Sequence, residues 1–434
     1  MVNNDWDYRF KVTSDNTKVA ASIKGLAIDL SNAPSEFWSN VKSDGSDIRV
    51  TDSSNNLVAR DVVSIDTSGQ TGLLRVDTSD ISTSADSDYY VYYGNASADE
   101  PAAGSTYGQY NAYESDVVVY YPFEEGSGST ASDRTSNENE GTLINSPDWI
   151  EGTLGNALKF DGSTNYVSAP HESELSLTNT NQSLSISAIL RFDALNNEWY
   201  MVSKYNFNSS IRSGWGLYFS PSFLGGSIGM IIARNGSNRR FVHADFNPST
   251  DTDYHVIATY NGGFDTSSFA FYINGVQYSS SSRLSDGSSG SISESHNFMV
   301  GSEDDGTRYY LGSADEVFVH KGVITFNEAT TSYNNESDND SFWTFGAQEE
   351  VGSGFISSTA ILDGSPVEGA TVRLINQSTN SYIGETETNT NGEYTFENLV
   401  EDDFYHVSGE YKDASDDTFR SFSYPYVKPE VNEE

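Results

Sequence analysis

Apolar residues occur along the chain in short runs, either continuous or alternating with polar residues. Clusters of Gly, Asn, Asp and Ser separate these runs at spacings of about ten residues, and hardly any segment shows the apolar stripe of an amphipathic helix. This pattern is typical of antiparallel β-sandwiches, so the sequence predicts an all-β fold. The clearest predicted strands cover residues 73–76, 89–93, 117–123, 184–192, 228–234, 254–260, 269–273 and 315–320.

Two changes in composition divide the chain. Residues 95–108 are rich in Ala, Ser, Gly and Asp, and residues 348–354 have the sequence of a short flexible linker. We therefore predict three tandem β-sandwich domains, covering residues 1–113, 114–350 and 351–434.

The first unit carries three signatures in order, Trp6-Asp-Tyr-Arg9, Ser46-Asp-Ile-Arg-Val-Thr-Asp52 and Tyr89-Tyr-Val-Tyr-Tyr-Gly-Asn95. It resembles an uncharacterised β-domain family that often precedes laminin-G-like domains in surface proteins. In a strand over 89–93, alternate aromatic side chains point to opposite faces. A role in the core is the simplest interpretation of these aromatics.

The central unit resembles a concanavalin A-like, laminin-G-like jelly roll. The resemblance rests on residues 117–128, on Gly155-Asn-Ala-Leu-Lys-Phe-Asp-Gly162, on Phe271-Tyr-Ile-Asn-Gly275 and on residues 312–317, all in family order. Asn274-Gly275 also predicts a hairpin with a type I′ turn, because both central positions of that turn have positive φ. The resemblance implies binding of glycans or proteins on a concave face or rim.

The resemblance further implies one Ca²⁺, because many jelly rolls of this family hold one. Its matching positions are Asp161 and Asp315, which family members tend to bring together on adjacent strands. Ca²⁺ takes hard oxygen ligands at about 2.3–2.6 Å. Glu316 is expected to point the other way, because neighbours on a strand alternate faces. The alternative is that Asp161 caps a turn and Asp315 accepts backbone hydrogen bonds.

Aromatic side chains in the central unit could stack on sugar rings. Segments 196–213 and 302–310 are the expected binding rims, because they mix aromatics with Asn, Arg and Asp. The wider candidates include Tyr200 and Trp215, although most aromatics of a sandwich lie in its core. The predicted ligand-binding residues are Trp199, Tyr205, Phe207, Tyr309 and Tyr310.

The third unit, through residues 357–374 and 388–396, resembles the carboxypeptidase-regulatory-type sandwich, an immunoglobulin-like module. Such modules are usually stalks or spacers, and we expect the same role here.

Charge narrows the possible functions. The 434 residues include 63 acidic and 23 basic side chains, which gives a formal net charge of −40. Such a surface repels phosphate backbones and anionic lipids, so nucleic-acid binding and membrane insertion are not expected. Abundant acids with few lysines indicate a protein that works in high salt, where charge repulsion is screened. An ordinary acidic extracellular protein is the alternative.

The chemistry that the sequence offers is limited. The chain has no Cys, and its six His are scattered. No catalytic motif or closely spaced carboxylates occur on a predicted strand, so we expect no enzyme. The sequence shows no export signal and no apolar run long enough to span a bilayer.

These observations favour an adhesion protein in the virion of a virus of halophilic archaea, either a tail fibre, a spike or a turret. The chain resembles haloarchaeal surface proteins and haloarchaeal virus fibre or spike proteins. Its expected partners are a host-surface glycan or S-layer glycoprotein, other virion proteins and further copies of itself. The first alternative is a secreted or wall-attached haloarchaeal glycan-binding protein, located at the cell surface. The second is a polysaccharide-degrading enzyme.

Overall fold

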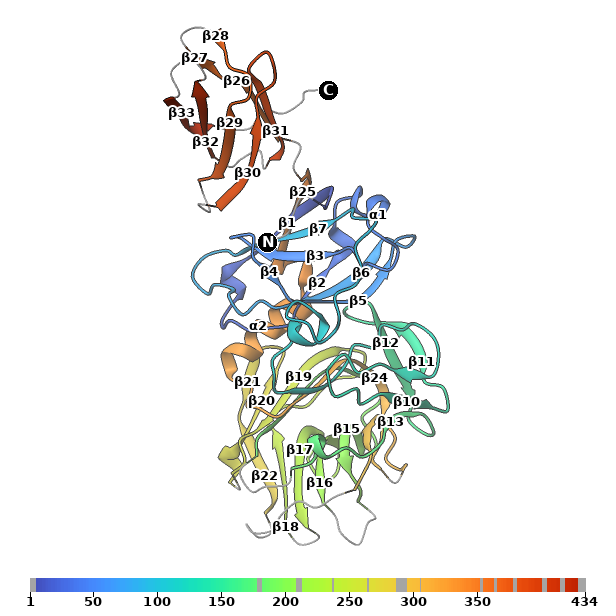
Figure 1. Ribbon diagram of the computed structural model, residues 1–434. Helices are drawn as coiled ribbons and strands as arrows, with labels where there is room; N and C mark the ends of the chain where they lie inside the picture. The colour runs from blue at the N-terminus through green and yellow to red at the C-terminus, as the bar shows by residue number, and fades with distance from the viewer. Residues whose placement is uncertain are drawn as a thin grey trace.

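The computed structural model describes residues 5–427 apart from 178–181, 208–212, 236–237, 264, 286–294, 305, 352–353, 363–364, 378–380, 400–403 and 414–417 (Figure 1). Nearly all of its regular structure is strand, which confirms the all-β prediction. In the described residues no helix is long and apolar enough to cross a membrane.

Two small sheets pack face to face in the N-terminal domain. Aromatic and aliphatic side chains fill the space between them, with Phe10, Phe37 and Tyr93 in mutual edge or tilted contact. Within the described residues the larger sheet has the order β25(Trp343–Glu350)-β1(Tyr8–Ser14)-β7(Asp88–Tyr93)-β3(Arg49–Asp52)-β4(Leu57–Val58), and the smaller has the order β2(Leu26–Asp29)-β6(Thr71–Val76)-β5(Arg60–Asp66). The short helix α1(Phe37–Asn40) belongs to the same domain.

The N-terminal sheet is completed by a strand from far along the chain. β25 pairs antiparallel with β1 and places Trp343 in the N-terminal core, where its Nε1 donates to the Ala27 carbonyl at 2.7 Å. The predicted central unit ended at residue 350, so the structure differs at this point. The pairing joins residues more than 300 positions apart, and no local pattern in the sequence indicates it.

The jelly roll consists of two large sheets. The outer sheet has the order β22(Ser280–Ser285)-β18(Asn238–Ala244)-β17(Ser227–Asn235)-β16(Gly214–Ser220)-β15(Trp199–Tyr205)-β23(Phe298–Val300)-β13(Tyr166–Ala169)-β10(Gly141–Ile144)-β9(Thr130–Ala131). The inner sheet has the order β11(Asp148–Glu151)-β12(Asn156–Asp161)-β24(Leu311–His320)-β14(Leu184–Phe192)-β19(Asp253–Tyr260)-β20(Phe269–Ile273)-β21(Val276–Tyr278), and β8(Val117–Tyr121) also pairs with β24. One continuous apolar core lies between the two sheets.

Alternation decides which side chains enter that core. On β14 and β19, the inward residues include Ile186, Leu190 and Val256, all fully buried. The hairpin from β20 to β21 turns at Asn274 and Gly275, with φ values of 50° and 70°. Both values lie in the left-handed region, as the predicted type I′ turn requires.

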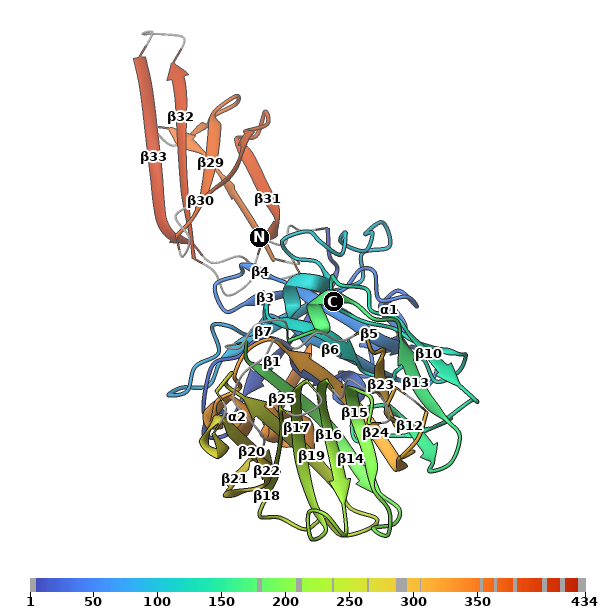
Figure 2. The same cartoon turned by 90° about the horizontal axis from the view of Figure 1, so that it is seen from below.

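The inner sheet is the side on which the N-terminal domain sits (Figures 1 and 2). Helix α2(Phe326–Ser337) leads back from the jelly roll and packs against β2 and β19, and α3(Asn339–Phe342) follows it. The side chain of Asn335 on α2 both donates to and accepts from the backbone of Ala27, at 2.9 and 2.8 Å. β2 is an edge strand of its sheet, and the side chain of Asn335 provides hydrogen-bond partners for the backbone N–H and C=O of Ala27 on this edge.

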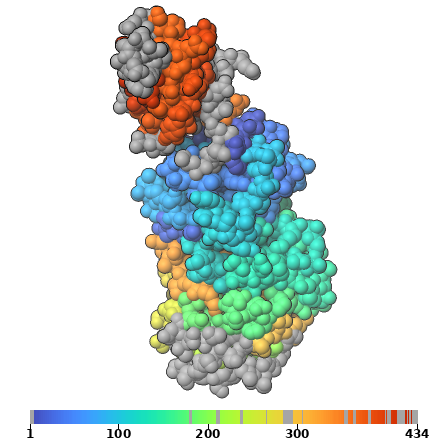
Figure 3. All heavy atoms as spheres, in the orientation of Figure 1, coloured from blue at the N-terminus to red at the C-terminus, as the bar shows by residue number. Residues whose placement is uncertain are grey.

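The C-terminal unit forms a separate lobe beyond the N-terminal domain (Figure 3). Its described strands are β26(Gly354–Thr359), β27(Ile361–Leu362), β28(Ser365–Pro366), β29(Thr371–Asn376), β30(Ser381–Glu387), β31(Glu393–Leu399), β32(Tyr405–Asp413) and β33(Thr418–Val427). A small core around Val372, Leu374 and Val407 holds them together.

We expect Trp343→Ala to lower the free energy of unfolding by about 3–5 kcal/mol, because it opens a large cavity in the N-terminal core and removes the hydrogen bond to Ala27. Urea denaturation measures the loss. Phe326→Ala, at a half-exposed aromatic on α2, is the control and should cost much less. Equal small losses for both variants would show that β25 does not complete the N-terminal core.

Candidate functional site

A cluster of aromatic side chains covers the outer face of the outer sheet, on the side opposite the jelly-roll core. Tyr200 on β15, Tyr218 on β16 and Phe241 on β18 form it with aliphatic neighbours. Tyr200 and Tyr218 stack with ring centroids 5.5 Å apart, and Phe241 meets Tyr218 edge-on at 5.3 Å. Alternation produces this layer, because the residues between these aromatics, such as Leu217 and Val242, enter the core.

A groove of about 270 Å³ lies over this aromatic layer. That volume is near the lower end of the range for ligand pockets. Half-buried Phe207 and exposed Phe223 present their rings at its margin. The complete lining consists of Glu198, Tyr200, Phe207, Tyr218, Phe223, Arg239, Phe241 and Arg308.

The two arginines of the groove, Arg308 and Arg239, differ in their partners. Arg308 lies 4.0 Å above the ring of Phe207 and is held by ion pairs with buried Glu303 and with Glu198. Arg239 is half-buried, and its Nε has no hydrogen-bond partner in the described part of the chain. The hydroxyl of Tyr218 is also buried without a partner. Burial, and secondarily Glu198, raises the pKa of Tyr218, so this hydroxyl keeps its proton as a donor.

The structure places the predicted aromatic residues in different environments. Phe207 lines the groove, whereas Trp199, Tyr205 and Tyr310 are fully buried. Tyr309 is half-buried beside Tyr166, with ring centroids 6.0 Å apart, and does not line the groove. Residues 208–212 and 305 of the two expected rims lie outside the described residues.

The sequence did not single out the other groove residues. Trp215, one of the wider candidates, is fully buried in the core, but Tyr200 does line the groove. The available signal was that Tyr218 and Phe241 occupy the strand face opposite to their core-facing neighbours Leu217 and Val242. The missed residues are Glu198, Tyr218, Phe223, Arg239, Phe241 and Arg308.

Asp161 and Asp315 do not converge on one ion. Asp161 pairs with Leu311 in the ladder between β12 and β24, four residues from Asp315. At about 3.3 Å per residue this separates the two carboxylates by about 13 Å, too far for one Ca²⁺. Asp161 instead accepts from the backbone of Ser163 and Thr164 in its own turn, each at 2.8 Å.

The described residues contain no group of three or more metal-ligating side chains placed to hold an ion. The two aspartates thus do not form the predicted shared site. Calcium binding by the jelly roll stays a prediction.

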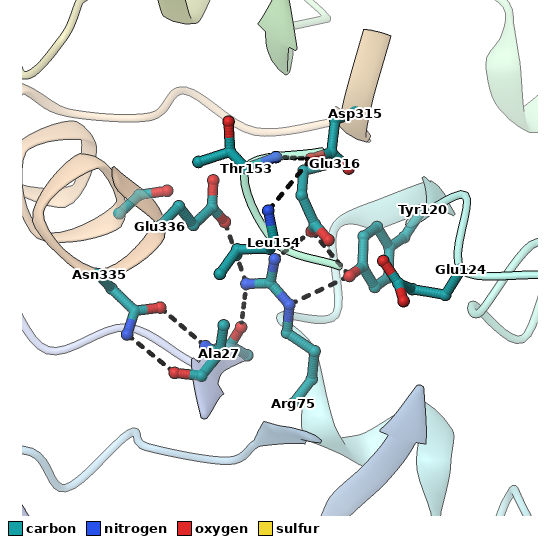
Figure 4. Close-up of polar contacts among 12 residues, drawn as sticks. Ala27, Arg75, Tyr120, Glu124, Thr153, Leu154, Asp315, Glu316, Asn335 and Glu336 are labelled. Atoms are coloured by element: carbon teal, nitrogen blue, oxygen red, sulfur yellow. Dashed lines mark hydrogen bonds and ion pairs between the residues drawn. The ribbon is translucent and has the colours of Figure 1, made fainter. Parts of the chain in front are cut away.

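A cluster of buried polar side chains lies where the N-terminal domain meets the inner sheet (Figure 4). Arg75 on β6 forms ion pairs with Glu316 on β24 and, at 3.0 Å, with Glu336 on α2. Its guanidinium also donates to the hydroxyl of Tyr120, at 3.1 Å, and to the carbonyl of Gly25, at 2.8 Å. One cation therefore bridges both domains and helix α2.

A β-bulge brings Asp315 and Glu316 to the same side of β24. The register with β14 shifts between Ser187 and Ile189, and Glu316 has a φ of 51° in the left-handed region. The expectation that Glu316 points away from Asp315 is therefore wrong. The bulge breaks the alternation and turns both carboxylates towards the domain contact (Figure 4).

Burial changes the proton affinity of these carboxylates. Burial raises the pKa of Glu316, although Arg75 acts in the opposite direction. It also raises the pKa of Asp315, next to Glu316, and the pKa of Glu124 to about 7. Glu336 differs, because Arg75 and His255 outweigh its burial and lower its pKa. Burial thus strengthens proton binding at Glu316, Asp315 and Glu124 but not at Glu336.

This proton retention predicts that stability falls as the pH rises. Folded Glu124 holds its proton to about pH 7, while the unfolded chain loses it near pH 4.5. The folded state therefore gains from this group at acid pH, and the gain disappears between about pH 5 and 8. In Glu124→Gln, the fall of melting temperature over this range should be smaller than in the wild type. Exposed Glu172→Gln removes the same charge and should leave the slope unchanged. Equal slopes in all three proteins would contradict the assignment.

Comparisons with known proteins support two of the domains. Residues 161–330 match the family model of the Concanavalin A-like lectin/glucanases superfamily, and residues 44–135 match a Domain of unknown function (DUF2341). No curated protein matches the chain.

The chain is also similar, at low sequence identity, to several solved structures. Domain 4 of AbnA, an extracellular arabinanase of Geobacillus stearothermophilus in complex with arabinotriose, is 17% identical, with a TM-score of 0.40 over 50% of this chain and 98% of that domain. The binding domain of Paraclostridial Mosquitocidal Protein 1 is 12% identical, with a TM-score of 0.41 over 72% of this chain and 73% of that chain. Trypanosoma rangeli sialidase in complex with the inhibitor DANA is 12% identical, with a TM-score of 0.37 over 58% and 41%. Together with the family models, the fold identifies residues 161–330 as a concanavalin A-like jelly-roll domain preceded by a domain of the DUF2341 type.

Proposed function

We propose that the chain is a glycan-binding attachment protein and that the groove on the outer sheet is its binding site. The observation that carries this proposal is an aromatic layer under a groove with buried polar groups that lack partners, on a lectin-type fold. Aromatic rings pack against the C–H faces of sugars, and polar groups at the margin bind the hydroxyls.

The proposed role is binding without catalysis. The groove has Glu198 as its lining carboxylate, and Glu198 is engaged with Ser220 and Arg308. Three carboxyl groups with raised pKa values, Glu124, Asp315 and Glu316, lie instead at the domain contact, buried against protein groups. Glycoside hydrolysis needs a pair of carboxylates on either side of the scissile bond, and the groove offers no such pair among the described residues.

For the setting we propose the surface of a virion of a virus of halophilic archaea. The acid excess supports a saline medium, and a string of β-sandwiches suits a projecting appendage. In this proposal the C-terminal unit is a spacer of the carboxypeptidase-regulatory type, and several copies of the chain assemble to gain avidity. Competition between the purified protein and virus for adsorption to host cells tests the setting. Binding without competition would favour the secreted or wall-attached alternative.

Phe223→Ala should weaken binding to host-surface glycans about threefold to tenfold, because it removes an exposed ring at the groove margin. Binding to glycans released from haloarchaeal cells, measured by calorimetry in molar salt, checks this. Tyr107→Ala is the control, since Tyr107 is 41% exposed, close to the 38% of Phe223, and lies in the segment before β8. Equal affinity of both variants would exclude the groove as the site.

The melting temperature should rise between 0.01 M and 1 M salt. With a net charge of −40, self-repulsion falls as the Debye length shrinks from about 30 Å to about 3 Å. Light scattering in molar salt should report a multimer. A monomer whose melting temperature does not respond to salt would contradict both the saline setting and the assembly.

A further inference from the structure

Two hydrogen-bond donors of the groove have no partner among the described residues. The Tyr218 hydroxyl and the Arg239 Nε are both buried atoms without partners in the described part of the chain. Tyr218 as a whole is only 4% exposed. A phenol with a raised pKa and a guanidinium both donate at neutral pH. A ligand that satisfies them must supply acceptor oxygens.

The acceptors of the groove are already engaged. Glu198 accepts from the Ser220 hydroxyl at 2.9 Å and lies 3.5 Å from Arg308. Arg308 also forms an ion pair with buried Glu303. Among the described residues, this leaves Arg239 as the lining cation without a carboxylate partner. The positive charge of Arg239 contrasts with the chain as a whole, which has 40 more acidic than basic residues.

We propose that the groove selects an acidic saccharide, whose anionic oxygens accept from Arg239 and Tyr218 while the sugar ring packs on Phe207 and Phe223. This inference rests on the function proposed above and names the ligand class of the same site. An anionic group is acceptor-only, so it matches two donors without adding a donor of its own. A neutral hydroxyl can also accept hydrogen bonds, but it would leave the charge of Arg239 without a counterion, and charge-assisted bonds are about twice as strong as neutral ones.

The long-range field of the protein sets the conditions for the test. A net charge of −40 repels an anionic glycan at low ionic strength. At 1 M salt the Debye length is about 3 Å, so this repulsion is screened while a direct contact inside the groove persists. Acid recognition should therefore be measured in molar salt.

The experiment compares three probes on the full chain in 1 M NaCl. These are an oligogalacturonate, the same oligomer after reduction of its carboxyl groups, and a sulfated galactan. We expect an acidic probe to bind about tenfold tighter than the reduced oligomer. The preferred acidic probe shows whether the anionic group is a carboxylate or a sulfate.

Three variants connect that preference with the groove. Arg239→Gln should abolish the preference for acid while retaining binding of the reduced oligomer. Tyr218→Phe keeps the ring and removes only the hydroxyl donor, so it should weaken acidic probes severalfold. Arg373→Gln is the matched control, because Arg373 is an exposed arginine of the C-terminal unit, paired with Glu385 and Glu410.

The outcomes separate this inference from the proposed function. Equal binding of acidic and reduced oligomers overturns the acid preference and leaves a glycan-binding groove. An acid preference that survives Arg239→Gln places the anion elsewhere and also overturns the inference. No binding to any probe or to host glycans overturns both proposals.

Discussion

The arrangement of the two larger domains depends on one buried cation. Arg75 is 2% exposed and lies between Glu316 of the inner sheet and Glu336 of helix α2. Removing three charges from water costs several kcal/mol each, and only close pairing with further hydrogen bonds compensates for it. Tyr120 and the Gly25 carbonyl provide those bonds. Loss of the arginine would leave buried Glu316 without its cation and Glu336 with only His255, so domain contact and charge pairing require each other.

The bulge in β24 is linked to the same buried cation, Arg75. In a regular strand Glu316 would share the core-facing side with Ala314 and lie in the apolar core, away from Arg75. The positive φ at Glu316 is costly for a residue with a side chain, and such strain persists only where the surroundings compensate. Arg75 of the N-terminal domain and Tyr120 of the adjacent strand β8 supply that compensation. The local backbone of the jelly roll is therefore shaped by its neighbour.

Local patterns predicted the fold better than the site. Alternation predicted the strands, and Asn274-Gly275 predicted its turn, because both depend on neighbours in the sequence. The pairing of β25 with β1 and the bulge at Glu316 depend on distant partners and left no local pattern.

The aromatics of the groove were harder to select, because strand β16 is buried on both faces. Trp215 and Tyr218 look alike in sequence, yet one enters the core and the other lies under the groove. Arg239 and Arg308 reach the groove from separate segments, which only the folded chain brings together.

The exposed faces of the two jelly-roll sheets therefore have different surroundings. The N-terminal domain and α2 cover much of the exposed side of the inner sheet, where the acid-rich cluster is neutralised by burial and by Arg75. Strands β15 to β18 of the outer sheet carry a second aromatic layer outside the core, which has no purpose in holding the two sheets together. Buried donors without partners at that layer cost free energy in the absence of a ligand. In the proposed function, a ligand on the outer sheet would supply the hydrogen-bond partners that these buried donors lack.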